Sequence, residues 1–233
     1  MPADVNEPIR PPTADDRTPE SVASTIAFVD LIQFTSLTNV HGDEAGADAA
    51  DTLESLTRGV LGDAVRLVKT AGDGVLLQAT NPHDALRCIA ALIEQLHDAG
   101  FDARAGADHG PVVARNGDVF GSIVNLAARL ASLADPGSVV MTRPVALAAT
   151  DLELAATALG PVEVRGFDAP IELFQVDPCH HHDHWFVDPV CGMRLEPGRA
   201  VSPDPGDPRV GFCSPRCAEL FEQSPERYRR VLD

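Results

Sequence analysis

The chain has little positive charge, few aromatic residues and no long apolar run. Its 233 residues include 18 Lys and Arg against 35 Asp and Glu, which gives a formal net charge of −17. A nucleic-acid partner or an anionic membrane surface would require a basic patch, so we expect neither. An anionic small ligand stays compatible with this charge, because a bound divalent metal ion reverses the local sign.

Membrane and export signals are missing as well. The longest apolar runs are much shorter than the about 20 residues of a bilayer-spanning helix, and the first residues contain no apolar core of a signal peptide. We therefore expect a cytoplasmic protein without a membrane partner. The hydrophobic content of 44% and the charged content of 23% are typical of a globular chain with a sizeable core.

The scarce residue types are distributed unevenly, which indicates a second module. The only Trp and the only Tyr, Trp185 and Tyr228, lie in the last quarter of the chain. Four of the five cysteines also lie there: Cys179, Cys191, Cys213 and Cys217. The fifth, Cys88, lies on the apolar face of the helix expected over 82–99, and we expect it to pack in the core of the protein.

These shifts in composition predict four segments. Residues 1–22 are rich in proline and acids without a periodic apolar pattern, so we interpret them as a disordered leader. Residues 23–177 form the main domain, 178–184 a His-rich linker and 185–233 a small Cys-containing module. A module of about fifty residues builds little core alone and needs a staple or a metal ion.

The order of expected elements predicts an α+β fold with a ferredoxin-like βαββαβ core and additional strands. The segment Asp108-His109-Gly110 is interpreted as a turn between two short strands. The expected strands are 25–32, 65–70, 75–79, 102–107, 111–115, 138–142, 162–165 and 171–176, and the expected helices are 43–67, 82–99 and a third around Asn125.

Carboxylates stand where the expected strands end. Asp30 closes the first strand, and Asp73 lies in the Asp-Gly turn of the first hairpin, four residues after Lys69. Two carboxylates brought together at strand ends are a divalent-metal site of the Mg²⁺ or Mn²⁺ kind. Two metal ions held in this way suit an in-line displacement at phosphorus.

A third polar group lies on the expected helix around Asn125. Asn125 and Arg129 are four residues apart and therefore share a helix face, which we expect to be otherwise apolar. An arginine fork on such a face matches a phosphate well. Each residue alone is also typical of a turn, an interface or a solvated surface, so the interpretation depends on their joint occurrence. The apolar neighbours are Ile123, Val124, Leu126 and Leu130.

The same residues lie in three blocks that resemble the catalytic domain of class III adenylyl and guanylyl cyclases. The blocks are Phe28–Thr35 (FVDLIQFT), Lys69–Gly74 (KTAGDG) and Asp118–Arg129 (DVFGSIVNLAAR). The resemblance runs from about residue 24 to residue 177, and the joint spacing of the blocks makes it specific. It implies the same ferredoxin-like core.

The resemblance also implies roles for the metal ions and the base. Asp30 and Asp73 would hold two Mg²⁺ or Mn²⁺ ions, with the Leu31 carbonyl as a further ligand. Lys69 and Asp118 correspond to the pair that reads adenine, in which Lys69 donates to a ring nitrogen and Asp118 accepts from the amino group. Guanine presents the opposite pattern, so the pair favours ATP over GTP.

The remaining roles concern the sugar and the phosphates. Asn125 would orient the ribose, and Arg129 would stabilise the charge that develops on the α-phosphate. The backbone N–H groups around Phe34 and Thr35, at a helix start, would hold the triphosphate. In the family the site lies between two domains; this chain carries one domain with both halves of the residue set, so the resemblance implies a head-to-tail homodimer.

One residue departs from the family pattern. Gln33 stands where the family usually has Gly before Phe-Thr. A side chain at this position crowds the triphosphate or alters the turn, so it is expected to affect the rate rather than the fold.

The C-terminal module resembles the YHS domain, a small cysteine module associated with proteins that handle heavy metals. Cys213 and Cys217, four residues apart, form a ligand pair and Cys191 a third ligand, a set that suits Zn²⁺ or Cu⁺. Candidates for a fourth ligand are Cys179, His180, His181, His182 and His184. The motifs that carry the resemblance are Asp188–Met193, Gly211–Cys217, Phe221 and Pro225–Tyr228.

Three hypotheses follow. The first is an adenylate cyclase whose metal-binding module regulates it. The second is a catalytically silent cyclase-fold dimer that senses nucleotide or metal, which Gln33 favours. The third is a metal carrier in which the C-terminal module does the work.

Overall fold

The computed structural model describes residues 21–178, 185–196, 198–201 and 210–229. The expected leader is therefore almost wholly outside the described residues. The same holds for Cys179 and the four histidines that were candidates for a fourth ligand.

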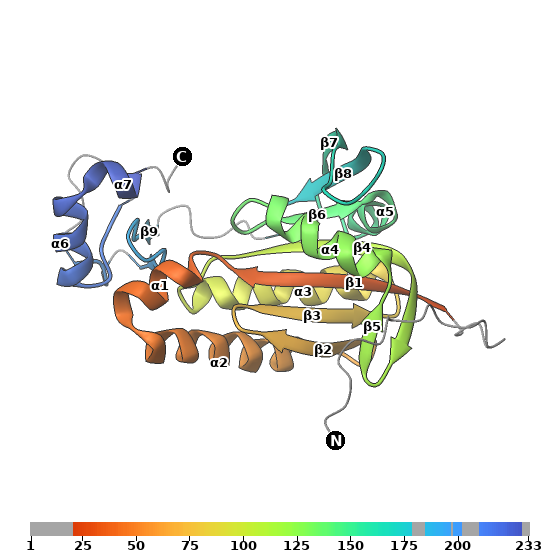
Figure 1. Cartoon of the computed structure of the whole chain (residues 1–233), viewed down its shortest axis with the longest axis horizontal. Helices are drawn as coiled ribbons and strands as arrows, with labels where there is room; N and C mark the ends of the chain where they lie inside the picture. Colours follow the sequence, from red (N-terminus) through yellow and green to blue (C-terminus); the bar gives the residue numbers. More distant parts are fainter. Residues whose placement is uncertain (1–20, 179–184, 197, 202–209, 230–233) are drawn as a thin grey trace, which may run out of the picture.

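The predicted α+β fold with a ferredoxin-like core is confirmed. The strands follow the order β2–β3–β1–β4–β6–β8–β7, and β5 pairs with β4 (Figure 1). The first four strands pair antiparallel in the order of a ferredoxin-like sheet. They are β1 Val22–Leu31, β2 Val65–Ala71, β3 Gly74–Ala79, β4 Ala103–Arg115, β5 Asp118–Phe120, β6 Val139–Thr142, β7 Thr157–Val162 and β8 Ile171–Val176.

Helices cover both faces of this sheet because β1, in its centre, alternates buried apolar side chains between them. Ala27 and Val29 lie in the cluster that also holds buried residues of α2 and α3, whereas Ile26 lies in the cluster with Ile123 of α4. The helices of this part of the chain are α1 Phe34–His41, α2 Asp43–Val60, α3 Pro82–Asp98, α4 Ser122–Leu133 and α5 Arg143–Asp151.

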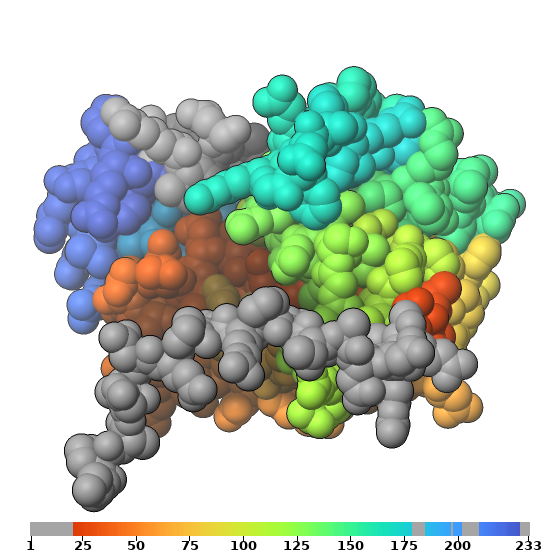
Figure 2. All heavy atoms as spheres, turned by 45° about the vertical axis from the view of Figure 1, so that its right-hand side comes forward, coloured from red at the N-terminus to blue at the C-terminus, as the bar shows by residue number. Residues whose placement is uncertain are grey.

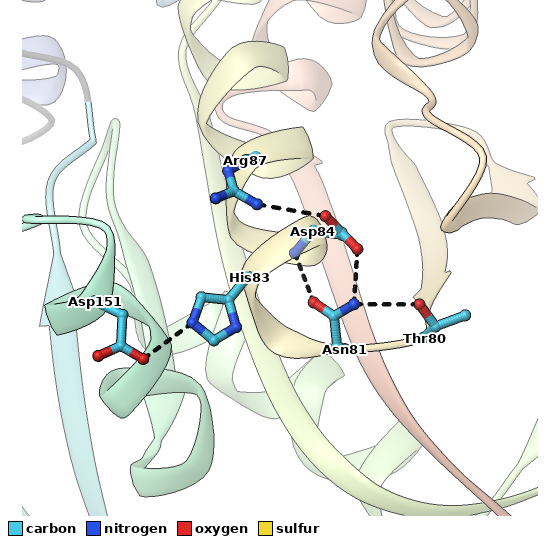
Figure 3. Close-up of polar contacts among 6 residues, drawn as sticks. All are labelled: Thr80, Asn81, His83, Asp84, Arg87 and Asp151. Atoms are coloured by element: carbon cyan, nitrogen blue, oxygen red, sulfur yellow. Dashed lines mark hydrogen bonds and ion pairs between the residues drawn. The ribbon is translucent and has the colours of Figure 1, made fainter.

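The start of α3 at Asn81, predicted from sequence, is confirmed by its capping contacts (Figure 3). The Asn81 side-chain oxygen accepts from the Asp84 backbone N–H at 3.0 Å, and its amide nitrogen donates to the Asp84 carboxylate at 2.7 Å. His83 then contacts Asp151 at 3.0 Å, which ties α3 to the end of α5. The cap satisfies backbone donors that a helix start leaves free.

The predicted turn at Asp108-His109-Gly110 is wrong, since β4 runs through it as one strand of 13 residues. These residues pair with β1 throughout, for example His109 with Thr25, and their polar groups are used across the sheet. Thr142 donates to the Asp108 carboxylate at 2.6 Å. The chain reverses instead at Asn116 and Gly117, both with positive φ, which is the requirement of a tight hairpin turn.

Two further expectations are corrected. The helix predicted over 43–67 ends at Val60, because Val65 already pairs with Ala79 in the sheet. The strand predicted over 162–165 is β7, which ends at Val162. The helix start expected at Phe34 and Thr35 is the start of α1, whereas the short helix α5 was not predicted.

The C-terminal part packs onto the sheet domain at the end where α1 lies, as Figures 1 and 2 show. Its elements are β9 Phe186–Val187, β10 Arg194–Leu195, α6 Pro215–Gln223 and α7 Pro225–Arg229. Arg194 forms an ion pair with the buried Asp102, and its N–H donates to the Gly100 carbonyl at 2.9 Å. Trp185 stacks on His97, with 5.4 Å between the ring centroids. The buried residues of the C-terminal part belong to the same apolar cluster as those of α2 and α3. They are Val190, Cys191, Val210, Phe212, Cys217 and Phe221.

Among the described residues, no helix has the length and the apolar composition that a bilayer crossing requires.

Gly106 on β4 lets α4 approach the sheet, which yields a stability prediction. A Cβ at Gly106 would overlap the backbone of Ala127 and Ala131, so Gly106→Ala is expected to lower the free energy of unfolding by about 2 kcal/mol or more. Gly59→Ala is the matched control, because a Cβ there meets no atom within 4 Å and an alanine in a helix is neutral or stabilising. Urea denaturation measures both; equal effects would contradict this account of Gly106.

Candidate functional site

Asp30 and Asp73, predicted as a metal-binding pair, lie together at one end of the sheet. Asp30 pairs with Gly74 across β1 and β3, and the Leu31 N–H donates to the Asp73 carbonyl at 2.8 Å. A Cβ at Gly74 would overlap the Asp30 carboxylate in its present position, so the glycine leaves room for it. The Leu31 carbonyl belongs to the same strand end.

The charge environment of Asp30 is that of a site for a cation. Partial burial and the neighbouring Asp73 raise the pKa of Asp30, while Arg104 lowers it. A divalent ion between two ionised carboxylates offsets their mutual repulsion and stabilises both in the charged form. The donor set, two carboxylates and a backbone carbonyl, is one that Mg²⁺ and Mn²⁺ prefer.

Helix α1 starts directly after this strand end. Gln33, its N-cap residue, adopts a left-handed conformation with φ of 59° and makes no side-chain cap bond. The first intrahelical bond of the turn is Leu37 N–H to the Gln33 carbonyl at 2.9 Å. The N–H groups of Phe34 and Thr35 point out of the first turn without helical partners, as at every helix start, and this arrangement suits a phosphate.

Lys69 and Asp118 are brought together from β2 and β5. The Lys69 ammonium lies 2.8 Å from the Asp118 carboxylate, and the other Asp118 oxygen accepts from the Val119 N–H at 2.8 Å. The hydrogen bond from Lys69, followed by that from Val119, holds the pKa of Asp118 below its usual range. The pair therefore presents a cationic donor and an anionic acceptor side by side, both accessible to solvent.

Asn125 and Arg129 share a face of α4 as predicted, but the expectation that this face is apolar is wrong. Both residues are exposed, whereas Ile123, Leu126 and Leu130 are buried against the sheet. The apolar positions follow the helical period on the opposite side. Asn125 and Arg129 consequently point away from the sheet that carries Asp30 and Asp73.

The three predicted cysteines of the C-terminal part meet, and a residue that the sequence did not indicate joins them. Cys213 Sγ lies 3.5 Å from the Sγ atoms of both Cys191 and Cys217. Nε2 of His41, the last residue of α1, lies 3.4 Å from Cys213 Sγ and 3.6 Å from Cys217 Sγ. Hydrogen bonds from the Cys191 and Cys217 thiols lower the pKa of the Cys213 thiol well below its usual range.

No local sequence signal marks His41, because it precedes Cys191 by 150 positions. Only the packing of the C-terminal part on α1 brings them together. The same packing accounts for the surroundings of Gln33, since a Cβ on Gly192 would overlap the Gln33 side chain.

Comparison with known proteins agrees with the sequence blocks. Residues 18–178 match the family described as the adenylate and guanylate cyclase catalytic domain. The pH-sensitive adenylate cyclase of Mycobacterium tuberculosis is 36% identical over 158 residues, which are 65% of this chain and 40% of that protein. The adenylate cyclase of Glutamicibacter nicotianae is 34% identical over 157 residues, 66% of this chain and 39% of that protein.

The chain thus spans about two fifths of the length of these relatives. Among solved structures, the adenylyl cyclase of Pseudomonas aeruginosa has a similar fold, with a TM-score of 0.57 and 20% identity over 67% of this chain and 94% of that one. The family match ends at residue 178, so the resemblance of the C-terminal part to the YHS domain stays a prediction.

The Lys69–Asp118 contact predicts a measurable shift. In Lys69→Ala the pKa of Asp118 is expected to rise toward the usual Asp value of about 3.9, because the largest cause of its lowering is removed. NMR titration of carboxyl-labelled protein measures it, with Asp118→Asn for assignment. Arg66→Ala is the control. It is expected to shift the pKa of Asp118 less, since Arg66 makes the smallest contribution to the lowering of that pKa. An unchanged pKa in Lys69→Ala would show that the pair does not persist in solution.

Proposed function

The chain belongs to the adenylate and guanylate cyclase catalytic-domain family, and from that premise we propose that it converts ATP into 3′,5′-cyclic AMP and pyrophosphate. The observation that carries this proposal is the Lys69–Asp118 contact. Adenine presents a ring-nitrogen acceptor beside an amino donor, which matches an ammonium donor beside a carboxylate acceptor. Guanine presents a ring N–H beside a carbonyl, which this pair would leave unsatisfied at a cost of several orders of magnitude in selectivity.

The reaction is an in-line displacement at the α-phosphorus. The ribose 3′-oxygen forms a bond to the α-phosphorus, the bond from that phosphorus to the bridging oxygen breaks, and pyrophosphate leaves. Asp30 and Asp73, with the Leu31 carbonyl, would hold two Mg²⁺ or Mn²⁺ ions. Such ions, when bound, favour loss of the 3′-hydroxyl proton and neutralise charge on the leaving group.

The chain's own residues then position the substrate. The N–H groups of Phe34 and Thr35 at the start of α1 bind the triphosphate. Asn125 orients the ribose, and Arg129 stabilises the negative charge that grows on the α-phosphate in the transition state. Holding the 3′-oxygen in line with the leaving group supplies much of the rate enhancement.

A homodimer is part of the proposal. Asn125 and Arg129 are exposed and point away from the sheet with the acids, so one subunit does not assemble the whole set. A head-to-tail two-fold dimer places the Asp30 half of one subunit opposite the Arg129 half of its partner, twice. Phe120, two residues after Asp118, is 52% exposed, which suits a surface that a partner covers.

A silent dimer that binds nucleotide without turnover is the second candidate. The observation that favours it is Gln33, whose side chain fills the space against Gly192 at the start of the phosphate-binding helix.

The activity is tested with purified protein, ATP and Mn²⁺, with cyclic AMP as the readout. Asp73→Ala is expected to lower kcat at least about 100-fold, because the metal ions lose a ligand. Asp63→Ala is the matched control: Asp63 is an exposed acid in the loop after α2, and its loss should leave the rate unchanged. ATP binding without any product would favour the silent dimer, and equal product from Asp73→Ala would exclude this site as the catalytic one.

The shared site is tested by complementation. Asp30→Ala and Arg129→Ala are each expected to be inactive, because each dimer then lacks one half in both sites. Co-expression produces mixed dimers with one intact site, so about a quarter of the wild-type activity should return. Asp30→Ala combined in one chain with Arg129→Ala, co-expressed with an inactive Asp73→Ala chain, is the control and should stay inactive, since neither site is then complete. Failure of the first pair to recover activity would contradict the dimeric site.

A further inference from the structure

Four soft ligand atoms converge between α1 and the C-terminal part. His41 Nε2 and the Sγ atoms of Cys191, Cys213 and Cys217 all lie within 4.8 Å of one another. Cys191 and Cys217 are buried, and His41 and Cys213 are partly exposed. No disulfide joins the described cysteines.

The spacing is that of a tetrahedral metal site. Zinc–sulfur bonds of about 2.3 Å with tetrahedral angles place neighbouring sulfur atoms about 3.7 Å apart. The Sγ separations of 3.5 Å from Cys213 to Cys191 and to Cys217, and those of 3.4 and 3.6 Å from His41 Nε2 to Cys213 and Cys217, are close to this value, and all four ligand atoms lie within 4.8 Å of one another. Three thiolates and one imidazole in a tetrahedron form a closed site without an open position, which is the structural zinc type.

The ligands are held in place by buried hydrogen bonds. The Asp188 carboxylate is fully buried and accepts from the N–H groups of Val190 at 2.9 Å and Cys213 at 2.8 Å. It thereby fixes the loops that carry Cys191 and Cys213. Ser214 caps α6 and accepts from the Cys217 N–H at 3.3 Å. Such supporting contacts orient metal ligands and are a feature of built sites.

The site also has access to solvent. A cavity of about 530 Å³ opens beside it, and the residues that line it include His41, Cys213, Ser214, Trp185 and Arg194. A metal ion or a chelator can reach the ligand atoms through this cavity.

We propose that His41, Cys191, Cys213 and Cys217 bind one zinc ion that fastens the C-terminal part to helix α1. The same part also contacts the other end of α1, where Gly192 lies against Gln33. Both ends of this eight-residue helix are therefore held from one side. Since the start of α1 binds the triphosphate in the proposed function, zinc occupancy sets the affinity for ATP.

The metal site is tested first, without any activity measurement. The full chain, purified under reducing conditions, is expected to bind about one equivalent of zinc and to give the visible absorption of tetrahedral thiolate-bound cobalt when Co²⁺ replaces it. His41→Ala should weaken zinc binding by more than about 100-fold. His41→Cys supplies a fourth thiolate and should retain zinc, and His83→Ala, which removes a histidine outside the cluster, should bind zinc as the wild type does.

Three results would overturn the zinc site: no bound zinc, a disulfide among these cysteines in the reduced preparation, or stoichiometric binding of Cu⁺ but not of Zn²⁺. A variant that fails to fold is replaced by chelation of the wild-type protein, in which zinc release is followed directly.

The coupling to α1 is tested by hydrogen exchange and kinetics. Removal of zinc from the wild type should speed amide exchange in 34–41 and, in an active enzyme, raise the KM for ATP with a smaller effect on kcat. His41→Cys with zinc should resemble the wild type in both. Bound zinc with unchanged exchange in α1 would overturn the coupling while the zinc site stands. If amide exchange in α1 depends on zinc but the protein forms no cyclic AMP from ATP, the proposed function is refuted and the zinc site and its coupling to α1 stand.

Discussion

The pairing of β1 with both β3 and β4 is the interaction on which the rest of the structure depends. It places β1 in the centre of the ferredoxin-like part, so that its alternating side chains build the cores on both faces of the sheet. The register with β3 puts Asp30 opposite Gly74 and therefore beside the Asp73 turn. Because α1 follows at once, Asp30, Asp73 and the start of a helix share one end of the sheet.

The C-terminal part packs against that same end of the sheet. Arg194 of the C-terminal part forms an ion pair with Asp102. Asp102 lies next to this end of the sheet, since its carbonyl accepts from the Ile32 N–H. The family's glycine before Phe-Thr is Gln33 here, and its side chain fills the contact with Gly192. The residue that departs from the family pattern in the sequence is thus, in the structure, the one that contacts a segment lying on this turn. The C-terminal part contacts both ends of α1, at Gln33 and at His41, which provides a direct physical route from that part to the proposed phosphate-binding turn.

Most of the sheet and of the candidate site was predictable from local patterns. The two strands of the first hairpin, its Asp-Gly turn and the Asn81 cap were confirmed. The errors arose where tertiary contacts override local preference. Gly110 is typical of a turn, yet it pairs with Ser24 in a continuous strand because β1 extends far enough to hydrogen-bond it. The face that carries Asn125 and Arg129 was expected to be apolar because apolar residues adjoin both of them in the sequence. Residues adjacent in sequence point to different sides of a helix, so these apolar neighbours lie on the buried side.

The sequence by itself determined the family and indicated the candidate site residues, because the spacing of the three blocks carries that information without coordinates. It also predicted that Cys191, Cys213 and Cys217 lie together, which the structure bears out. Only the tertiary structure decided that His41 joins them and that Gln33 faces Gly192. Those contacts connect residues between 150 and 176 positions apart, and nothing in either local segment specifies the other. They exist because a C-terminal part too small to bury its own apolar side chains shares the core of the sheet domain.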